Sequence, residues 1–275
     1  MGMKTVAIVQ ARLGSSRLPG KILKPLLGRS ILLHVLDRCK KISGVDSVCC
    51  ATTDNPEDDA VADEAAYSGY SVFRGDENDV LKRYLGAARS LDAQRIVRVT
   101  SDCPLIDPAV SAQVLDLMDQ SGVDYACNNQ PPEWPHGLDT EAFTRDALER
   151  TASEARKPSE REHVTPYMRS HESFIRRSLP GPKGEAAQCR WTIDTPADLE
   201  FFKALFPLLP AGPEALDWQV VFEIVQRNPH LTRLNSGQDR FSGLKNSLAE
   251  DNKAGFGIEV DTALERHVGH EETNK

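Results

Sequence analysis

Apolar runs and helical patterns alternate through the first half of the chain. Short apolar runs predict buried β-strands, and the stretches between them carry apolar residues three and four positions apart, which predicts amphipathic helices. This alternation is typical of a doubly wound α/β fold, in which helices cover a mostly parallel sheet. We expect strands near 5–10, 47–52, 71–73 and 95–100, and helices near 30–41, 56–68, 78–91 and 108–120.

The pattern changes near residue 123. Residues 125–129 predict one more strand, and the Pro and Gly residues in 130–137 predict a loop. We expect a helix near 144–156 and a strand at 190–194, with which the chain returns to the sheet. Residues 123–189 are therefore predicted to form an inserted lid, and such insertions often carry specificity.

The last third of the chain is first helical and then polar. A capped helix is expected from Thr195 to about Phe206, and another helix near 217–227. Beyond Asn235 only residues 241–248 are patterned enough for a short helix. We expect a single domain over 1–235, a helical extension over 236–250 and a disordered tail over 251–275.

Composition and charge narrow the classes of partner. The chain has 275 residues, of which 40% are hydrophobic, and this is enough to bury a full core. Neither a membrane span nor a signal peptide is expected, so we predict a cytoplasmic protein. A net charge of −8 argues against a nucleic acid or an anionic membrane as the main partner. The six cysteines form no C-x-x-C pair, and we expect most of them to be buried thiols.

The first predicted strand runs directly into a cationic loop. Residues 10–21 read QARLGSSRLPGK and contain two Gly, two Ser, two Arg and one Lys. Backbone N–H groups and hydroxyls can bind phosphate oxygens, and the three cations can offset their charge. The order of residues fits neither the P-loop nor the Rossmann dinucleotide fingerprint. A solvated basic loop is the simpler interpretation, but the composition also predicts a polyphosphate site.

Two aspartates stand where predicted strands end. Asp102 follows the strand at 95–100, and Asp194 ends the strand at 190–194. Ligands of open parallel sheets bind at the carboxyl edge, although either aspartate could instead cap a turn or helix. Two carboxylates opposite a cationic loop suit a Mg²⁺-nucleotide, because they leave positions open for phosphate and water. We therefore predict that Asp102 and Asp194 bind Mg²⁺.

Three motifs in this order resemble those of the CMP-sugar synthetases. They are R-x-x-S-S-R-x-P-G-K at 12–21, D-x-P-L-I at 102–106 and I-D-T-P-x-D-L at 193–199. The chain is similar to acylneuraminate and 3-deoxy-manno-octulosonate cytidylyltransferases, and especially to the spore-coat polysaccharide (SpsF-type) branch. The resemblance extends from Val6 to about Leu248. It implies a Rossmann-like three-layer sandwich of the nucleotide-diphospho-sugar transferase (GT-A-like) type.

The resemblance also implies a reaction. A Mg²⁺-dependent enzyme of this family transfers CMP from CTP to a sugar acid or related acceptor and releases pyrophosphate, for surface polysaccharide or glycan synthesis. Family members are commonly homodimers. The residues expected to act in catalysis are Arg12, Lys21, Asp102 and Asp194.

The nucleotide site is expected around the first loop and the end of the strand at 95–100. Thr100 and Ser101 replace the Gln and Gly of the octulosonate branch. The identity of the base is therefore less certain than the binding of the phosphates. The stretch 79–83 is a further candidate for contact with base or ribose. The residues expected to bind nucleotide are Gln10, Ala11, Arg12, Gly14, Ser15, Ser16, Arg17, Lys21, Arg74, Thr100 and Ser101.

The acceptor site is expected in the lid. The sequences HGLDTE at 136–141 and REHVTPY at 161–167 resemble motifs of the spore-coat branch. Arg161 could bind an acceptor carboxylate, and His163 or Asp139 could take the proton of the attacking hydroxyl. A polar run such as 160–163 can equally be a solvated helix face. The residues expected to bind acceptor are Asp139, Glu141, Arg161 and His163.

Two alternatives keep a nucleotide site but change the function. The first is a GT-A-type glycosyltransferase that uses a finished nucleotide-sugar, and the second is a non-catalytic nucleotide-binding protein. The three cations of the first loop favour a triphosphate substrate over a nucleotide-sugar. Both acidic motifs favour catalysis, since binding alone does not require a metal site with two carboxylates.

Overall fold

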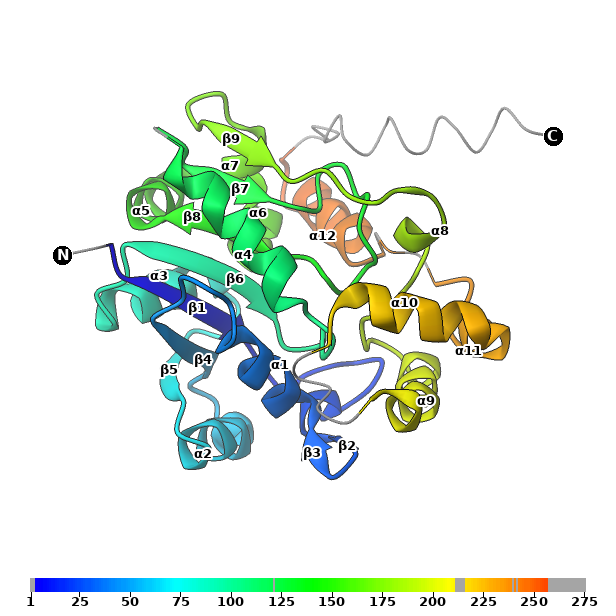
Figure 1. The fold of residues 1–275 in the computed structure, drawn as a ribbon. Coiled ribbons are helices and arrows are strands. Elements are labelled where there is room, and N and C mark those ends of the chain that lie inside the picture. The colour runs from blue at the N-terminus through cyan, green and yellow to red at the C-terminus, as the bar shows by residue number, and fades with distance from the viewer. Residues whose placement is uncertain (1–2, 121, 211–215, 239, 241, 257–275) are drawn as a thin grey trace.

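A seven-stranded sheet lies at the centre of the molecule (Figure 1). The computed structural model describes residues 3–120, 122–210, 216–238, 240 and 242–256. The strand order is β5-β4-β1-β6-β8-β7-β9, and the first four of these strands are parallel. Their bounds are β1 Thr5–Gln10, β4 Ser47–Thr53, β5 Ser71–Gly75 and β6 Arg95–Thr100. The predicted α/β class with a mostly parallel sheet is confirmed.

The other half of the sheet is mixed. β8 (Glu141–Thr144) runs antiparallel to β6, β7 (Tyr125–Cys127) runs antiparallel to β8, and β9 (Arg176–Ser178) runs parallel to β7. Three strands of residues 123–189 therefore belong to the main sheet, so the expectation that this whole segment leaves the core is wrong. A separate ribbon pairs β2 (Pro25–Leu26) with β3 (Arg29–Ser30).

Successive residues of the central strands enter two different cores. Ala7 and Val9 of β1 pack in one cluster, and Val6 and Ile8 pack in the other. This follows from the two-residue period of a strand, whose side chains point alternately to opposite faces. Both faces are apolar and both are covered by helices, as the continuous apolar run predicted.

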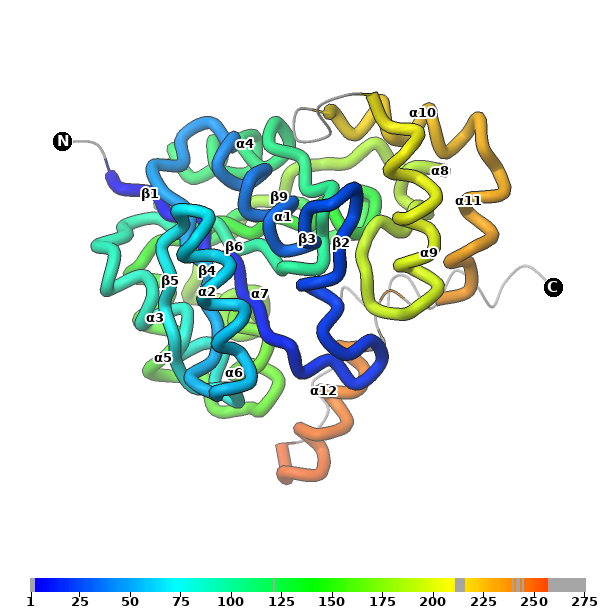
Figure 2. Tube along the Cα trace, turned by 90° about the horizontal axis from the view of Figure 1, so that it is seen from below, coloured from blue at the N-terminus to red at the C-terminus, as the bar shows by residue number. Residues whose placement is uncertain are grey.

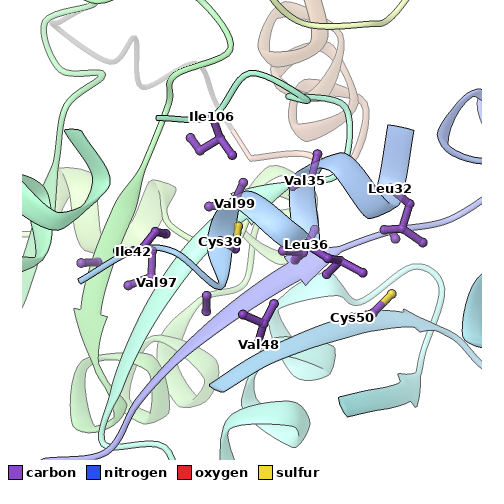
Figure 3. Packing of buried hydrophobic residues seen from close by; sticks show 14 of the residues in the cluster. Leu32, Val35, Leu36, Cys39, Ile42, Val48, Cys50, Val97, Val99 and Ile106 are labelled. Atoms are coloured by element: carbon purple, nitrogen blue, oxygen red, sulfur yellow. The ribbon is translucent and has the colours of Figure 1, made fainter. Parts of the chain in front are cut away.

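Helices form the outer layers of the sandwich. α1 (Ile31–Cys39), α2 (Asp59–Tyr67) and α4 (Pro108–Asp116) contribute to one core, which Figure 3 shows around Leu36 of α1. α3 (Val80–Ser90), α5 (Arg145–Glu154) and α7 (Pro166–Ser170) contribute to the other. Short 3₁₀ turns are η1 Lys21–Leu23, η2 Pro56–Asp58, η3 Leu117–Asp119 and η4 Phe206–Leu208.

The helices between residues 184 and 234 lie to one side of the sheet (Figures 1 and 2). A third apolar cluster joins α9 (Pro196–Leu205), α10 (Trp218–Arg227) and α11 (Pro229–Leu234). α6 (Pro158–His163) contacts both α3 and α12 (Ser242–Lys253), and α8 spans Gly184–Ala187. Among the helices that the structure describes, none is long and apolar enough to cross a membrane.

Two predictions of local structure need correction. Residues 190–194 form no strand, because their backbone groups bond to loops: Trp191 N donates to His136 O at 2.6 Å, and Ile193 N donates to Asp102 O at 2.9 Å. The helix expected at 241–248 continues to Lys253, so the tail expected from residue 251 begins too early. Residues 257–275 of that tail lie outside the described residues.

Leu36 provides a test of the first core. Its side chain is fully buried between α1 and the sheet, so Leu36→Ala should lower the free energy of unfolding by about 2–5 kcal/mol through lost burial and a cavity. Urea denaturation measures this change. The matched control is Leu208→Ala, because Leu208 is 46% exposed and should change the free energy by less than about 0.5 kcal/mol. Equal effects of the two substitutions would contradict the described packing.

Candidate active site

A cavity of about 470 Å³ lies at the carboxyl ends of β1 and β6. It brings together every residue predicted to bind nucleotide except Arg74, and it adds residues from α3, α6 and α12. This is the edge at which open parallel sheets bind their ligands. The lining residues are Gln10, Ala11, Arg12, Gly14, Ser15, Ser16, Arg17, Lys21, Ile22, Val80, Arg83, Thr100, Ser101, Asp102, Glu162, His163 and Asn246.

Backbone hydrogen bonds shape the loop after β1. Leu13 N donates to the Asp58 carboxylate at 2.7 Å, and Gly20 N returns to Leu13 O at 3.2 Å. Gly20 has φ 65°, a left-handed conformation that glycine adopts without strain, and it lets the chain turn into η1. The loop is therefore fixed at both ends, and its Ser and Arg side chains line the cavity between them.

The Lys21 ammonium sits between the two predicted metal ligands. Its Nζ lies 2.8 Å from Asp102 Oδ2, 3.0 Å from Asp194 Oδ1 and 2.7 Å from Ile193 O. Burial acts to lower the pKa of Lys21, but the two carboxylates outweigh it and the pKa is raised. Lys21 is therefore charged, and three oxygens converge on a single cation. The prediction that Asp102 and Asp194 lie together is confirmed.

Asp102 is held in its ionised form. Thr100 Oγ1 donates to Asp102 Oδ1 at 2.6 Å, and Lys21 donates to the other carboxylate oxygen. Burial acts to raise the pKa of Asp102, but the Lys21 charge and these hydrogen bonds outweigh it, so the pKa lies below its ordinary value. Thr100 therefore orients a carboxylate as well as lining the cavity.

Arginines surround the carboxylate of Asp194. Arg190 contacts it at 3.0 Å and the Asp198 carboxylate at 2.7 Å, while Arg17 lies 3.3 Å from Asp194. Asp198 is fully buried and accepts hydrogen bonds from the N–H groups of Asp194 and Thr195, so it fixes the start of α9.

The formal charges of this cluster cancel. Three carboxylates, on Asp102, Asp194 and Asp198, face three cations, on Lys21, Arg17 and Arg190. A divalent cation added alone would leave two excess positive charges. A polyphosphate that enters with the cation would restore the balance.

Arg83 is a buried cation in the cavity wall. Its Nη1 donates to Asp76 O at 2.9 Å, and its Nε has no hydrogen-bond partner in the described part of the chain. The residue is 2% exposed, and burial lowers its pKa, since a charged group is disfavoured away from water. Within the stretch 79–83 predicted from sequence, Arg83 is thus the residue that brings a buried cation to the cavity wall.

Two predicted arginines are engaged elsewhere. Arg74 donates to Thr53 O at 2.9 Å and Asn55 O at 2.8 Å, so it holds the loop after β4 and does not line the cavity. Arg161 pairs with Asp79 at the start of α3 and donates to Ala152 O at 3.0 Å. The structure therefore does not support nucleotide binding by Arg74 or acceptor binding by Arg161.

The acidic residues of the predicted acceptor site are also paired with other residues of the protein. Glu141 is 2% exposed and its carboxylate is shared by Arg98, Tyr125 and Thr165, so its assignment to the acceptor is wrong and its position is structural. Asp139 pairs with Arg240 at 2.8 Å and is not among the residues that line the cavity.

His163 is the predicted acceptor residue that reaches the cavity. Its Nε2 lies 2.6 Å from Ser247 Oγ of α12, and burial lowers its pKa, which favours the neutral ring. Glu162 and Asn246 line the same wall. Glu162 stood within a predicted motif, but no sequence pattern pointed to Asn246, which lies in an extension to which we had assigned no role.

Comparisons of sequence and of structure with known proteins both find cytidylyltransferases. A family model described as cytidylyltransferase matches residues 6–225. The spore coat polysaccharide biosynthesis protein SpsF of Bacillus subtilis is 33% identical over 231 residues, 81% of this chain and 94% of that protein. A 3-deoxy-manno-octulosonate cytidylyltransferase of Anaeromyxobacter sp. (strain K) is 31% identical over 273 residues, 96% of each. The solved structure of a cytidylyltransferase from Leptospira borgpetersenii, 34% identical, aligns with a TM-score of 0.80 over 86% of this chain and all of that one.

His136, which lies beside Arg190, makes stability depend on pH. Burial lowers its pKa from 6.5 to about 4 in the folded chain, so the unfolded chain takes up the proton first as pH falls. The free energy of unfolding should therefore decrease between pH 6.5 and pH 4, by up to about 3 kcal/mol from this group.

The measurement is urea denaturation of the unmodified protein and of His136→Gln across this range. The variant should lose that part of the pH dependence, whereas the exposed control His171→Gln should keep it. Parallel curves for the unmodified protein and His136→Gln would contradict the assignment.

Proposed function

Because this chain belongs to the cytidylyltransferase family, we propose that it transfers CMP from CTP to a hydroxyl of a sugar acceptor and releases pyrophosphate. The observation that carries the proposal is a cationic loop opposite two carboxylates that converge on one cation. The named relatives favour a sugar acid or a related acceptor, and synthesis of a surface polysaccharide or glycan. A homodimer in the cytoplasm is part of the same proposal.

The donors around Lys21 fit a divalent cation. The ammonium acts as a stand-in ion, since Asp102, Asp194 and Ile193 O already direct hard oxygens at one positive charge. The described residues hold no group of three or more His, Cys, Asp and Glu that could bind a metal, so phosphate and water would complete the coordination. Asp102 and Asp194 would hold Mg²⁺. When bound, this ion would neutralise phosphate charge and lower the pKa of the acceptor hydroxyl.

Lys21 has two roles in this scheme. Without substrate it neutralises Asp102 and Asp194, and with a metal ion held by these carboxylates its ammonium group would be free to turn toward the cavity. Arg12, Arg17 and Lys21 then supply three positive charges for the β and γ phosphates, where charge develops on the leaving pyrophosphate. The balanced charge of the cluster favours entry of metal and triphosphate together.

The nucleotide base is assigned to the side of the cavity next to α3. Arg83 brings a guanidinium to this wall, and Gln10 and Ser101 add polar groups. Cytosine presents two adjacent acceptors, O2 and N3, and one amino donor. A guanidinium suits such an acceptor edge because it only donates hydrogen bonds.

His163 is the proposed acceptor of the hydroxyl proton. Ser247 Oγ donates to Glu162 Oε2 at 3.1 Å, so His163 Nε2 donates to Ser247 and leaves Nδ1 as the basic nitrogen. A neutral imidazole with one free nitrogen is the form that a general base requires. Asp139, which pairs with Arg240, is less suited to that role.

Pyrophosphate release from the four nucleoside triphosphates tests the proposed function. The acceptor panel contains 3-deoxy-manno-octulosonate, 8-amino-3,8-dideoxy-manno-octulosonate and N-acetylneuraminate, with Mg²⁺ present. We expect release only with CTP and an acceptor, and Asp102→Asn should lower the rate by about 10²- to 10³-fold through loss of a metal ligand. The control is Asp116→Asn, an exposed carboxylate on α4.

The products distinguish the alternatives. Formation of a nucleoside diphosphate from a nucleotide-sugar would indicate a glycosyltransferase. Binding of CTP without turnover on any member of the panel would indicate a non-catalytic protein. Either outcome would contradict transfer to the α-phosphorus.

Lys21→Met tests the exchange between ammonium and metal. Removing the ammonium leaves Asp102 and Asp194 underneutralised, so the nucleotide-free variant should bind Mn²⁺ at least about tenfold more tightly than the unmodified protein. Titration calorimetry measures this affinity, while kcat should fall because the pyrophosphate loses a counter-charge. Lys24→Met, a nearby lysine that does not line the cavity, is the control. Unchanged Mn²⁺ affinity would show that Lys21 does not compete with the metal.

A further inference from the structure

The C-terminal segment, described over residues 235–238, 240 and 242–253, contacts the acidic cluster at its start and α6 at its end. Asn235 Nδ2 donates to Arg190 O at 3.0 Å, beside the acidic cluster. Arg240 donates to Trp134 O at 2.9 Å and to Asp139 at 2.8 Å, in the loop between β7 and β8. The segment lies beyond residues 6–225, which the family model matches. These contacts therefore belong to a part of the chain outside the matched region.

The end of the segment is anchored on α6. The carboxylate of Asp251 is 97% buried, and it accepts hydrogen bonds from the backbone N–H (2.8 Å) and the hydroxyl of Ser159. One turn earlier, Ser247 contacts His163 and Glu162. Figure 2 shows α12 beside α6 at the margin of the molecule. The two anchors fix α12 so that Asn246 lines the cavity.

This wall and the proposed base site lie toward different strands of the sheet, although α6 also packs on α3. Arg83 donates to Asp76 O just after β5, and its helix α3 packs on β5, β4 and β1. The charges of Arg98 in β6 and Glu141 in β8 act on His163. In the sheet, β8 lies next to β6 on the side away from β1. A nucleotide that fills the α3 side would leave the wall of Glu162, His163 and Asn246 for the second substrate.

The chemistry of the wall differs from that of the loop. Among the described residues that line the cavity, the cations are Arg12, Arg17, Lys21 and Arg83, and none of them belongs to α6 or α12. The wall instead presents a carboxylate, a neutral imidazole and a carboxamide. Such groups bind hydroxyl or amino substituents by hydrogen bonds, so they suit the part of a sugar acid that lies away from its carboxylate.

We propose that this C-terminal segment, in its described residues 235–238, 240 and 242–253, forms the acceptor side of the site, with Asn246 as a residue that determines specificity. Asn246 contacts hydroxyl or amino groups of the acceptor, and Glu162 favours an amino group. Asp251 is a positioning residue, which acts by holding α12 on α6. This inference rests on the proposed function, since it names the surface that the second substrate of that reaction meets.

Steady-state kinetics of Asn246→Ala test the contact. The probes are 3-deoxy-manno-octulosonate and its 8-amino-3,8-dideoxy analogue, which differ by one hydroxyl and one amino group. The KM for the acceptor should rise about five- to tenfold, as expected for one lost hydrogen bond, while the KM for CTP changes less than about twofold. Asn252→Ala, an exposed asparagine of the same helix, is the matched control.

Asp251→Ala tests the anchor. Undocking α12 should raise the acceptor KM at least as much as Asn246→Ala, and Asp251→Asn should restore part of it because an amide oxygen can still accept from Ser159. Calorimetric binding of CTP, unchanged in these variants, shows that the nucleotide side remains folded.

The outcomes separate this inference from the proposed function. An active unmodified enzyme whose acceptor KM is insensitive to both substitutions overturns the inference alone. An Asn246→Ala variant whose CTP KM rises, with the acceptor KM unchanged, places α12 on the nucleotide side and also overturns it. No turnover by the unmodified enzyme with any acceptor of the panel overturns both.

Discussion

The ammonium group of Lys21 joins three segments that are remote in sequence. It lies 81 residues from Asp102 and 173 residues from Asp194, yet it bonds to both carboxylates. Through these bonds the loop after β1, the end of β6 and the start of α9 share one point. Like charges at Asp102 and Asp194 would repel without a cation between them. The cavity wall therefore depends on a positive charge at this position in every state of the site.

The sequence predicted those parts of the fold that have a strong local pattern. β1, β4 and β6 are buried on both faces and read as apolar runs, and their ends correctly pointed to the carboxyl edge where Asp102 lies. β8 has four residues and β9 is the exposed sequence Arg-Arg-Ser, so neither carries a periodic signal. Residues 190–194 read as a strand because Trp191, Thr192 and Ile193 have high strand propensity, although their partners are loops.

The structure brings the predicted loop and acids together at one cavity, whereas other predicted side chains have their partners elsewhere in the protein. A motif shows that a residue is polar but not which group it meets, and Glu141 and Arg161 meet Arg98 and Asp79 inside the protein. Asn246 is the converse case, a residue that lines the cavity although no motif marks it. It reaches the cavity because Asp251 anchors the helix on Ser159, a contact across 92 residues that no local pattern encodes.

The reversed direction of β8 has a consequence for how related sites can diverge. Since β8 is antiparallel to β6, its first residue, Glu141, pairs with Arg98 near the carboxyl end of β6, and its last residue, Thr144, pairs with Arg95 at the far end. The connection that enters β8, from residue 128 to residue 140, thus arrives at the ligand edge. Insertions or deletions in this connection would reshape the rim while leaving the strand register and α5 intact. Related sites can in this way differ in the shape of their rim through changes of loop length alone.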